Sequence, residues 1–216
     1  MNNERIEKKF VLGKYEEDFV QKILLGSGFK RLFAPRKVSS IYLDTINYNF
    51  VKDNINGVSK RKKIRFRWYN DDYTNIYLEE KNKQNFLVKK KFRKILKFDK
   101  SLTFIENLRS YFLSLKKFNK NYNFKFILKT SYLRTYWISN DKKIRATIDS
   151  NIIASPINDL NRNLNLNETI LEFKFSPISE KNFRNLFHNY NLNLRSKKYS
   201  KYLQSFLLLD DAGLIN

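Results

Sequence analysis

Residues 61–68 read Arg61-Lys62-Lys63-Ile64-Arg65-Phe66-Arg67-Trp68, and the alternation within them indicates the architecture of the chain. Its odd positions are basic, whereas Ile64, Phe66 and Trp68 are apolar. Successive side chains of a strand point to opposite faces, so the stretch predicts a strand with one charged and one apolar face. The alternation returns in residues 77–81 and 89–93. Three neighbouring antiparallel strands are therefore predicted.

The charged face of these strands is unusually one-sided. A solvent-exposed face of an ordinary sheet would show the same alternation, and this is the simplest interpretation. Such a face normally mixes acids with bases, because like charges directly opposite each other destabilise a strand pair. Here Glu79 is nearly the only acid. Like charges ~6 Å apart repel by roughly 3 kcal/mol at an effective dielectric constant of ~20, so the face predicts a bound anion.

Composition bounds the remaining possibilities. A chain of 216 residues with 42% apolar content can bury a sizeable core, and a single domain over residues 1–216 is predicted. The 43 Lys and Arg residues against 21 Asp and Glu give a net charge of +22, which predicts a polyanionic partner: nucleic acid, an anionic membrane or a phosphate-rich molecule. The abundance of Asn, Ile and Phe is also typical of an A/T-rich genome, so charge alone is weak evidence.

Several classes of site are excluded by residue counts. The chain has no cysteine and a single histidine, His188, which excludes disulfides, thiolate zinc sites, a cysteine nucleophile and histidine metal clusters. The N-terminus has no apolar signal core, and no run of about 18 apolar residues is present. A soluble cytoplasmic protein without a transmembrane segment is predicted.

Periodicity along the chain predicts the other elements. Pro35 is expected to break the chain before a strand at residues 38–45, and three- and four-residue steps predict a helix over 101–115, capped by Asp99 or Ser101. Further strand patterns lie at residues 124–138, 143–149 and 169–175. About eight such strands predict an α+β fold: an antiparallel eight-stranded β-barrel with a charged interior and flanking helices. Its lumen would be lined by Lys9, Arg61, Arg65, Arg67, Lys81, Lys89, Lys91, Arg134, Arg145, Lys174, Lys198 and Lys201.

A set of short motifs resembles a known family. The motifs are Glu7-Lys8-Lys9-Phe10, Ser40-Ile41-Tyr42-Leu43-Asp44-Thr45, Ile64-Arg65-Phe66-Arg67-Trp68-Tyr69, Leu78-Glu79-Glu80-Lys81, Ser131-Tyr132-Leu133-Arg134-Thr135, Leu171-Glu172-Phe173-Lys174 and Tyr199-Ser200-Lys201-Tyr202. Together they resemble the VTC domain, the polyphosphate polymerase domain of the vacuolar transporter chaperone complex, within the triphosphate tunnel metalloenzymes of the CYTH-like superfamily. The resemblance covers residues from about 4 to 203, which leaves 204–216 as a C-terminal tail.

The resemblance implies a phosphotransferase that moves the γ-phosphate of ATP onto a growing polyphosphate chain inside a tunnel, with Mn²⁺ or Mg²⁺. By position, Lys9, Arg65, Arg67, Lys81, Lys89, Arg134, Arg145, Lys198 and Lys201 match its phosphate-binding residues, with Arg61, Lys91, Lys174 and Ser200 as secondary candidates. Glu172 matches the metal-binding glutamate; Glu7, Glu79 and Asp149 are secondary candidates or, as an alternative, ion-pair partners of basic residues. ATP and inorganic polyphosphate are the implied partners, together with a membrane-bound partner subunit.

Other functions fit parts of the same pattern. Relatives in the superfamily hydrolyse triphosphates or cyclise ATP, and some family members are accessory subunits without polymerase activity. The aromatic residues Trp68, Tyr69, Tyr73, Tyr77 and Phe86 among basic ones would also suit a binder of single-stranded nucleic acid. A non-catalytic polyphosphate-binding module is a third interpretation. Because the basic set and Glu172 are all present, an active domain is favoured over an accessory subunit, and a nucleic-acid partner is not expected.

Overall fold

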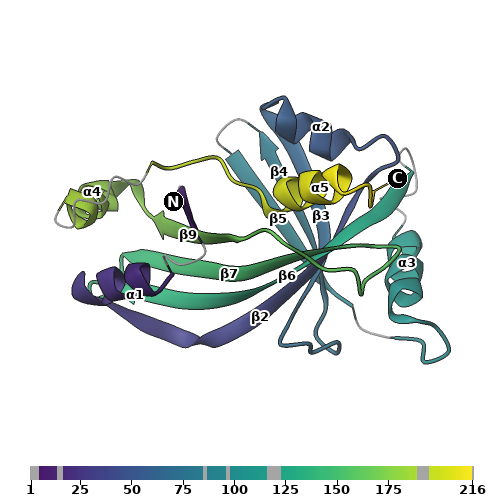
Figure 1. The fold of residues 1–216 in the computed structure, drawn as a ribbon, viewed down its shortest axis with the longest axis horizontal. Helices are drawn as coiled ribbons and strands as arrows, with labels where there is room; N and C mark the ends of the chain where they lie inside the picture. Colours follow the sequence, from purple (N-terminus) through teal and green to yellow (C-terminus); the bar gives the residue numbers. More distant parts are fainter. Residues whose placement is uncertain are drawn as a thin grey trace. The chain divides into compact units, whose positions relative to one another are not determined.

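The computed structural model describes residues 5–13, 17–84, 87–95, 98–115, 123–188 and 195–215. The strands are β1 (Ile6–Gly13), β2 (Phe29–Thr45), β3 (Lys60–Tyr69), β4 (Tyr77–Gln84), β5 (Leu87–Lys94), β6 (Phe124–Ser139), β7 (Ile144–Pro156), β8 (Leu164–Asn165) and β9 (Glu168–Phe175) (Figure 1). The helices are α1 (Glu17–Gly26), α2 (Asn49–Ile55), α3 (Phe104–Ser114), the 3₁₀ turn η2 (Pro177–Ser179), α4 (Glu180–His188) and α5 (Lys201–Asp211).

The strands form one sheet in the order β1-β9-β7-β6-β2-β3-β4-β5, with the short β8 paired to β7. The pairs β1–β9, β7–β9, β2–β3, β3–β4 and β4–β5 are antiparallel. The predicted α+β class, with an antiparallel sheet and flanking helices, is confirmed. Among the described residues, β1 and β5 are the two edges of this sheet and do not pair with each other. The predicted closed barrel is therefore not confirmed by the hydrogen bonding.

The chain divides into two compact units. Unit 1 consists of Met1–Lys37, Ser131–Ile153 and Asn165–Ser200, and unit 2 consists of Val38–Thr130, Ala154–Leu164 and Lys201–Asn216. Each unit has its own apolar packing and its own charged strand face, and each is described by itself below.

Unit 1 is built around an apolar cluster between helix and strands. Val20 and Leu24, four residues apart on α1, pack into a cluster that contains Phe173 of β9 and Trp137 of β6. Residues four apart lie on one face of a helix, which is why this spacing buries both. Alternate residues of β1, β7 and β9 supply most of the rest of the cluster, together with Phe29 of β2 and Phe183 of α4. The opposite face of these strands carries the charged side chains of Lys9 and Glu172.

Unit 2 packs the apolar face of β3 against aromatic residues. Phe66 stacks on Phe126 of β6 with ring centroids 5.8 Å apart and contacts Phe112 of α3 at 6.4 Å. In Figure 1, α2 lies beside α5, and the two helices are in contact. The apolar positions of residues 61–68 are thus buried, as the alternation predicts, and the odd positions form the opposite face.

The cap of α3 differs from the prediction. Thr103 Oγ1 accepts the N–H of Glu106, and the Glu106 carboxylate accepts the N–H of Thr103, which makes a reciprocal capping box. The predicted cap Asp99 instead accepts the N–H and the hydroxyl of Ser101 within the preceding turn. The helix begins later because the Thr103–Glu106 pair satisfies two N–H groups at once.

Pro35 does not end a strand, contrary to the sequence-based expectation. Strand β2 runs through it from Phe29 to Thr45, and its ladder with β3 covers only Val38 to Leu43. Pro35 lies before this ladder, so its missing N–H removes no hydrogen bond to β3.

Candidate functional site

The charged face of unit 2 is set by strand register. Arg65 lies opposite Glu79, Lys63 opposite Lys81 and Arg67 opposite Tyr77. Side chains at directly opposed positions lie on the same face of a sheet. On β3 and β4, Lys63, Arg65, Arg67 and Lys81 therefore share this face with one carboxylate, that of Glu79.

Arg65 and Arg67 converge on the carboxylate of Glu79. Arg65 Nε donates a hydrogen bond of 2.7 Å to Glu79 Oε2, and Arg67 Nη1 lies 3.8 Å from the same oxygen. Arg65 Nη1 also donates to the hydroxyl of Tyr42, and Arg67 Nε to the hydroxyl of Ser40, each at 3.2 Å. We call these five residues the arginine cluster. Burial disfavours the ionised form of Glu79 and would raise its pKa. The positive charges of Arg65 and Arg67 outweigh this effect, so the pKa of Glu79 is lowered.

A buried network holds the Tyr42 side of this cluster. The ring of Tyr42 stacks on Tyr202 of α5, with centroids 4.8 Å apart, and the Tyr202 hydroxyl donates to Asp44 at 2.7 Å. The Asp44 carboxylate also accepts the N–H groups of Phe50 and Val51, at 2.9 Å and 3.0 Å. Burial raises the pKa of Asp44 in spite of these hydrogen bonds, and burial beside Asp44 raises that of Tyr202. The network fixes α5, whose first residue is Lys201, over β2.

Unit 1 presents a second charged face, on β1, β9 and β7. Lys9 lies opposite Glu172, which in turn lies opposite Thr147. Lys174 Nζ lies 2.5 Å from Glu172 Oε1, and Lys9 Nζ lies 3.1 Å from Glu7 Oε1. We call these five residues the carboxylate cluster.

The two carboxylates and two lysines of this cluster shift one another's pKa values. Burial raises the pKa of Glu172, but the Lys174 and Lys9 ammonium groups outweigh burial, so the pKa is lowered; the nearby Glu7 carboxylate acts in the opposite direction. Burial lowers the pKa of Lys9, but Glu172 and Glu7 outweigh it and the pKa is raised. Glu172 is thus ionised and sits beside a second negative charge.

Arg134 and Asp149 form a bidentate ion pair in unit 1. Arg134 Nε and Nη2 donate to the two carboxylate oxygens of Asp149 at 2.5 Å and 2.7 Å. The Asp149 side chain is fully buried, and that of Arg134 is 15% exposed. Burial alone would lower the pKa of Arg134, but the Asp149 carboxylate raises it well above its ordinary value.

The donors around Glu172 suit a hard divalent cation. Among the described residues no group of three or more His, Cys, Asp and Glu is close enough to hold a metal. Within the carboxylate cluster, however, the carboxylates of Glu172 and Glu7 are neighbours, and the buried Thr147 Oγ1 opposite Glu172 makes no hydrogen bond to any described residue. Mg²⁺ and Mn²⁺ take oxygen ligands of these kinds. Glu172 would hold the ion, with Glu7 and Thr147 beside it.

Comparison with known proteins places the chain in a family. The family model of the VTC domain matches residues 4–209, almost the whole chain. The chain belongs to the VTC domain family. No curated protein sequence matches it.

Solved structures share the fold of this VTC domain. A proposed adenylate cyclase from Vibrio parahaemolyticus is 10% identical, with a TM-score of 0.56 over 94% of this chain and 98% of that one. A proposed adenylyl cyclase from Hippeastrum, described as having a dominant triphosphatase activity, is 10% identical, with a TM-score of 0.54 over 96% of each chain. A protein from Pyrococcus horikoshii OT3 is 16% identical, with a TM-score of 0.52 over 95% of this chain and 99% of that one. At these identities the likeness shows that the fold is shared.

Strand β5 presents different residues from those predicted. Lys89 lies opposite Asn82 and Lys91 opposite Glu80, so both lie on the face of β4 that is turned away from the Glu79 side chain. The prediction that Lys89 and Lys91 share a face with Arg65 is therefore wrong. Lys90, opposite Lys81, lies on the face of the arginine cluster and is among the charges that lower the pKa of Glu79.

The other sequence-predicted residues of the VTC domain fall in several places. Arg145 lies opposite Lys174 on the face of the carboxylate cluster and is exposed. In unit 1, Lys198 is exposed and Ser200 is half-buried. In unit 2, Arg61 lies opposite Lys83 on the face of the arginine cluster. Thr147, Ser40 and Tyr42 were missed as site residues, although Ser40 and Tyr42 alternate along β2 and this alternation could have indicated them.

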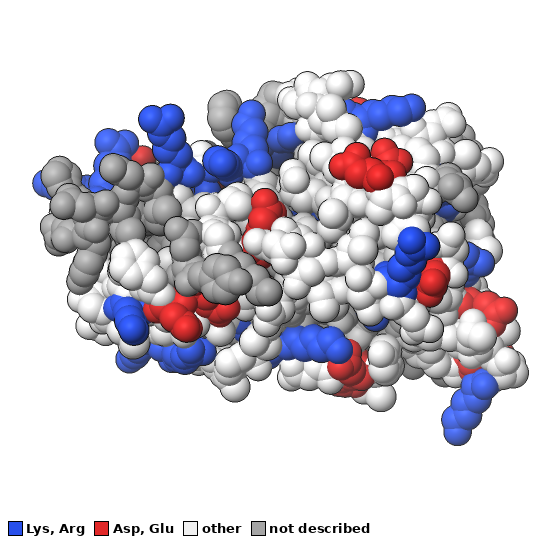
Figure 2. All heavy atoms as spheres, viewed as in Figure 1, with Lys and Arg blue, Asp and Glu red and all other residues white. Residues whose placement is uncertain are grey.

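The aromatic residues considered for base stacking differ in exposure: among the described ones, Tyr73 is exposed, and Tyr69 and Tyr77 are half-buried. Trp68 is buried, with its ring 5.2 Å from Phe104 and 5.8 Å from Tyr73. Phe86 lies outside the described residues. Figure 2 shows lysine and arginine side chains spread over the visible surface next to a few acidic ones, so surface charge alone does not locate a site. None of the described helices is both long and apolar enough to cross a membrane.

Proposed function

We propose that this VTC domain is a polyphosphate polymerase that transfers the γ-phosphate of ATP onto a polyphosphate chain with Mn²⁺ or Mg²⁺. Family membership supports the class of substrate. The observation that carries the proposal is the arginine cluster: Arg65 and Arg67 converge on Glu79, on a strand face where basic groups exceed acidic ones. Partly desolvated guanidinium groups in excess over carboxylates bind phosphate oxygens strongly.

The reaction requires little covalent chemistry from the protein. The terminal oxygen of the acceptor polyphosphate attacks the γ-phosphorus, the bond from this phosphorus to the β,γ-bridging oxygen breaks, and the nucleoside diphosphate leaves. Arg65 and Arg67 bind phosphoryl oxygens, and Ser40, Tyr42 and Glu79 hold the two guanidinium groups in place. Within unit 1, a divalent ion held by Glu172 would supply positive charge that binds phosphoryl oxygens.

The test is incubation of the purified protein with ATP and Mn²⁺, with polymer and free phosphate measured separately. We expect polymer on a polyphosphate-stained gel and its loss in Glu172→Gln, while nucleotide binding is retained. Glu180→Gln is the matched control, because Glu180 forms a surface ion pair with Arg184 and belongs to neither charged cluster. Full activity in Glu172→Gln would contradict the metal-binding role. If the wild-type protein forms neither polymer nor free phosphate, the result would indicate a binding module or an accessory subunit.

Triphosphate hydrolysis is the second candidate. The Hippeastrum neighbour, described as having triphosphatase activity, shares the fold, and an arginine-rich phosphate site serves hydrolysis equally well. The same assay separates the two reactions, because a hydrolase releases free phosphate without polymer. A nucleic-acid partner is not proposed, since Trp68 is buried in the apolar packing of unit 2.

A further inference from the structure

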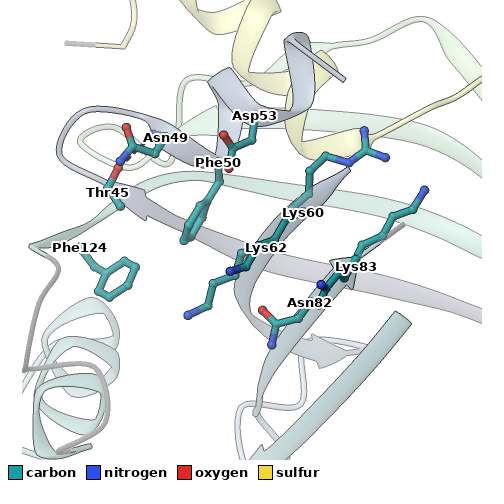
Figure 3. A pocket seen from close by; sticks show the side chains of 11 residues that line it. Thr45, Asn49, Phe50, Asp53, Lys60, Lys62, Asn82, Lys83 and Phe124 are labelled. Carbon is teal, nitrogen blue, oxygen red and sulfur yellow. Dashed lines mark hydrogen bonds between the residues drawn. The ribbon is translucent and has the colours of Figure 1, made fainter. Parts of the chain in front are cut away.

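Unit 2 contains a pocket that the proposed reaction does not use. It lies where α2 meets the start of β3 and the end of β4, and its volume is about 470 Å³ (Figure 3). Pockets that bind small organic ligands typically measure ~300–1,000 Å³. The pocket is therefore large enough for a ligand of nucleotide size.

The walls of the pocket combine aromatic, amide and basic groups. Figure 3 shows Phe50 and Phe124 on one side, facing Lys60, Lys62 and Asn82 from the two strands. The two rings have centroids 6.1 Å apart, and Lys62 Nζ lies 5.9 Å from the Phe124 centroid. Apolar rings next to ammonium groups suit a ligand that has both a flat aromatic part and an anionic part.

The pocket is distinct from the arginine cluster, although the two share strands. Lys62 lies directly opposite Asn82, and both alternate with Arg61 and Lys83. Because side chains alternate along a strand, Lys62 and Asn82 lie on the face of β3 opposite to that of Arg65. A ligand seated between Lys62 and Phe124 would therefore not be the phosphate group held by Arg65.

The charge of the lining selects the ligand class. Four basic residues line the pocket, Lys60, Arg61, Lys62 and Lys83, against one acid, Asp53. Lys62 forms an ion pair with Glu80 at 3.3 Å, so its charge is partly compensated. The exposed Lys60 and the half-buried Arg61 and Lys83 add positive charge at the rim. An uncharged aromatic ligand would gain nothing from the positive charge of the lining, and an inorganic phosphate would gain nothing from the rings.

We infer that this pocket binds a nucleotide as a second site. The base stacks against Phe124, the side-chain amides of Asn49 and Asn82 supply donors and acceptors for its edge, and Lys60, on the same strand face as Lys62, binds the phosphates. Amide groups serve this purpose because each carries both donors and an acceptor. The inference does not depend on polymerase activity, since the pocket and its lining exist whichever reaction the arginine cluster supports.

The test is calorimetric titration of the full chain with ADP in the presence of saturating inorganic triphosphate, which occupies a phosphate site but has no base. We expect residual ADP binding that Phe124→Leu weakens by about tenfold, because base stacking on an aromatic ring is worth roughly this much. Leucine keeps most of the apolar volume beside Phe50 and Phe112, so the variant retains much of the packing while losing the aromatic face. Adenosine and inorganic phosphate, titrated separately, should each bind more weakly than ADP.

A second variant keeps the test decisive if Phe124→Leu unfolds. Lys60→Glu reverses one exposed charge at the rim, and we expect it to weaken ADP binding several-fold, whereas the exposed control Lys100→Glu should not. No ADP binding in the presence of triphosphate, or equal affinity in the wild type and both pocket variants, would overturn the inference. Polymer formation is measured independently, so failure of the proposed function would not be mistaken for failure of this site.

Discussion

Replacing Asp149 by asparagine tests the buried ion pair of unit 1 and the role of Arg134 together. Asp149 is fully buried and accepts two hydrogen bonds from Arg134, whose side chain is only 15% exposed. Removing one partner of a buried pair typically costs ~3–5 kcal/mol, because the remaining charge stays desolvated without compensation. The residual exposure of Arg134 favours the lower end, about 3 kcal/mol. For a chain of this length, that loss lowers Tm by about 6–12 °C.

The assay is thermal unfolding near neutral pH, followed by circular dichroism. Asp141→Asn is the matched control, because Asp141 is exposed and accepts hydrogen bonds from Ser139 and Lys143 of its own turn and from the side chain of Asn182, with no buried ion pair. It should lower Tm far less. If Asp149→Asn melts within about 2 °C of the wild type, the ion pair does not stabilise the fold as argued.

Inorganic triphosphate separates a structural Arg134 from one that binds phosphate. If the guanidinium binds phosphate, the anion replaces the missing carboxylate in Asp149→Asn, and ligand should raise the Tm of this variant more than that of the wild type. If Arg134 only serves the fold, the two shifts should be equal. The double variant Arg134→Met/Asp149→Leu should recover most of the lost stability, because no unpaired charge remains.

Two further predictions concern unit 2. The pKa of Glu79 is lowered from 4.5 in the folded state, so its contribution to stability is complete above that pH and is lost as pH falls through the lowered value. Glu79→Gln should be less stable at neutral pH and lose less stability on acidification, measured by urea unfolding across this range; an unchanged pH dependence would contradict the ion pair. Lys90→Ala should raise the KM for ATP by about tenfold, the effect of one hydrogen bond to a charged group, whereas Lys89→Ala should change it less than twofold. Equal effects in the two lysine variants would reject the strand register.

Alternation within each strand was predictable because it depends on neither the partner strand nor the rest of the fold. Arg65 and Arg67 alternate with Phe66, and the structure buries Phe66 while the two arginines share the opposite face with Glu79. The same holds for Glu172 beside Phe173 in unit 1. A period of two residues is a local property, so it can be read directly from the sequence.

Register between strands was not predictable in the same way. Lys89 and Lys91 alternate with apolar residues in the sequence just as Arg65 and Arg67 do. A shift of one residue in the pairing with β4 nevertheless moves both lysines to the other face of the sheet. The Asp44–Tyr202 hydrogen bond was equally hidden, because it joins positions 158 residues apart in the sequence. Only tertiary structure brings such residues together.

The carboxylates show why the residue type alone does not reveal a metal ligand. Glu79 and Asp149 both bind arginines, which favours the ion-pair alternative for each of them. Glu172 also has a lysine partner, but it differs in lying beside a second carboxylate, Glu7, whose charge opposes its ionisation. Two neighbouring carboxylates repel each other, and a fold that needed only charge compensation would gain by separating them. A divalent cation removes this repulsion, which is why Glu172, rather than Glu79 or Asp149, is the position at which we expect substitution to change metal dependence.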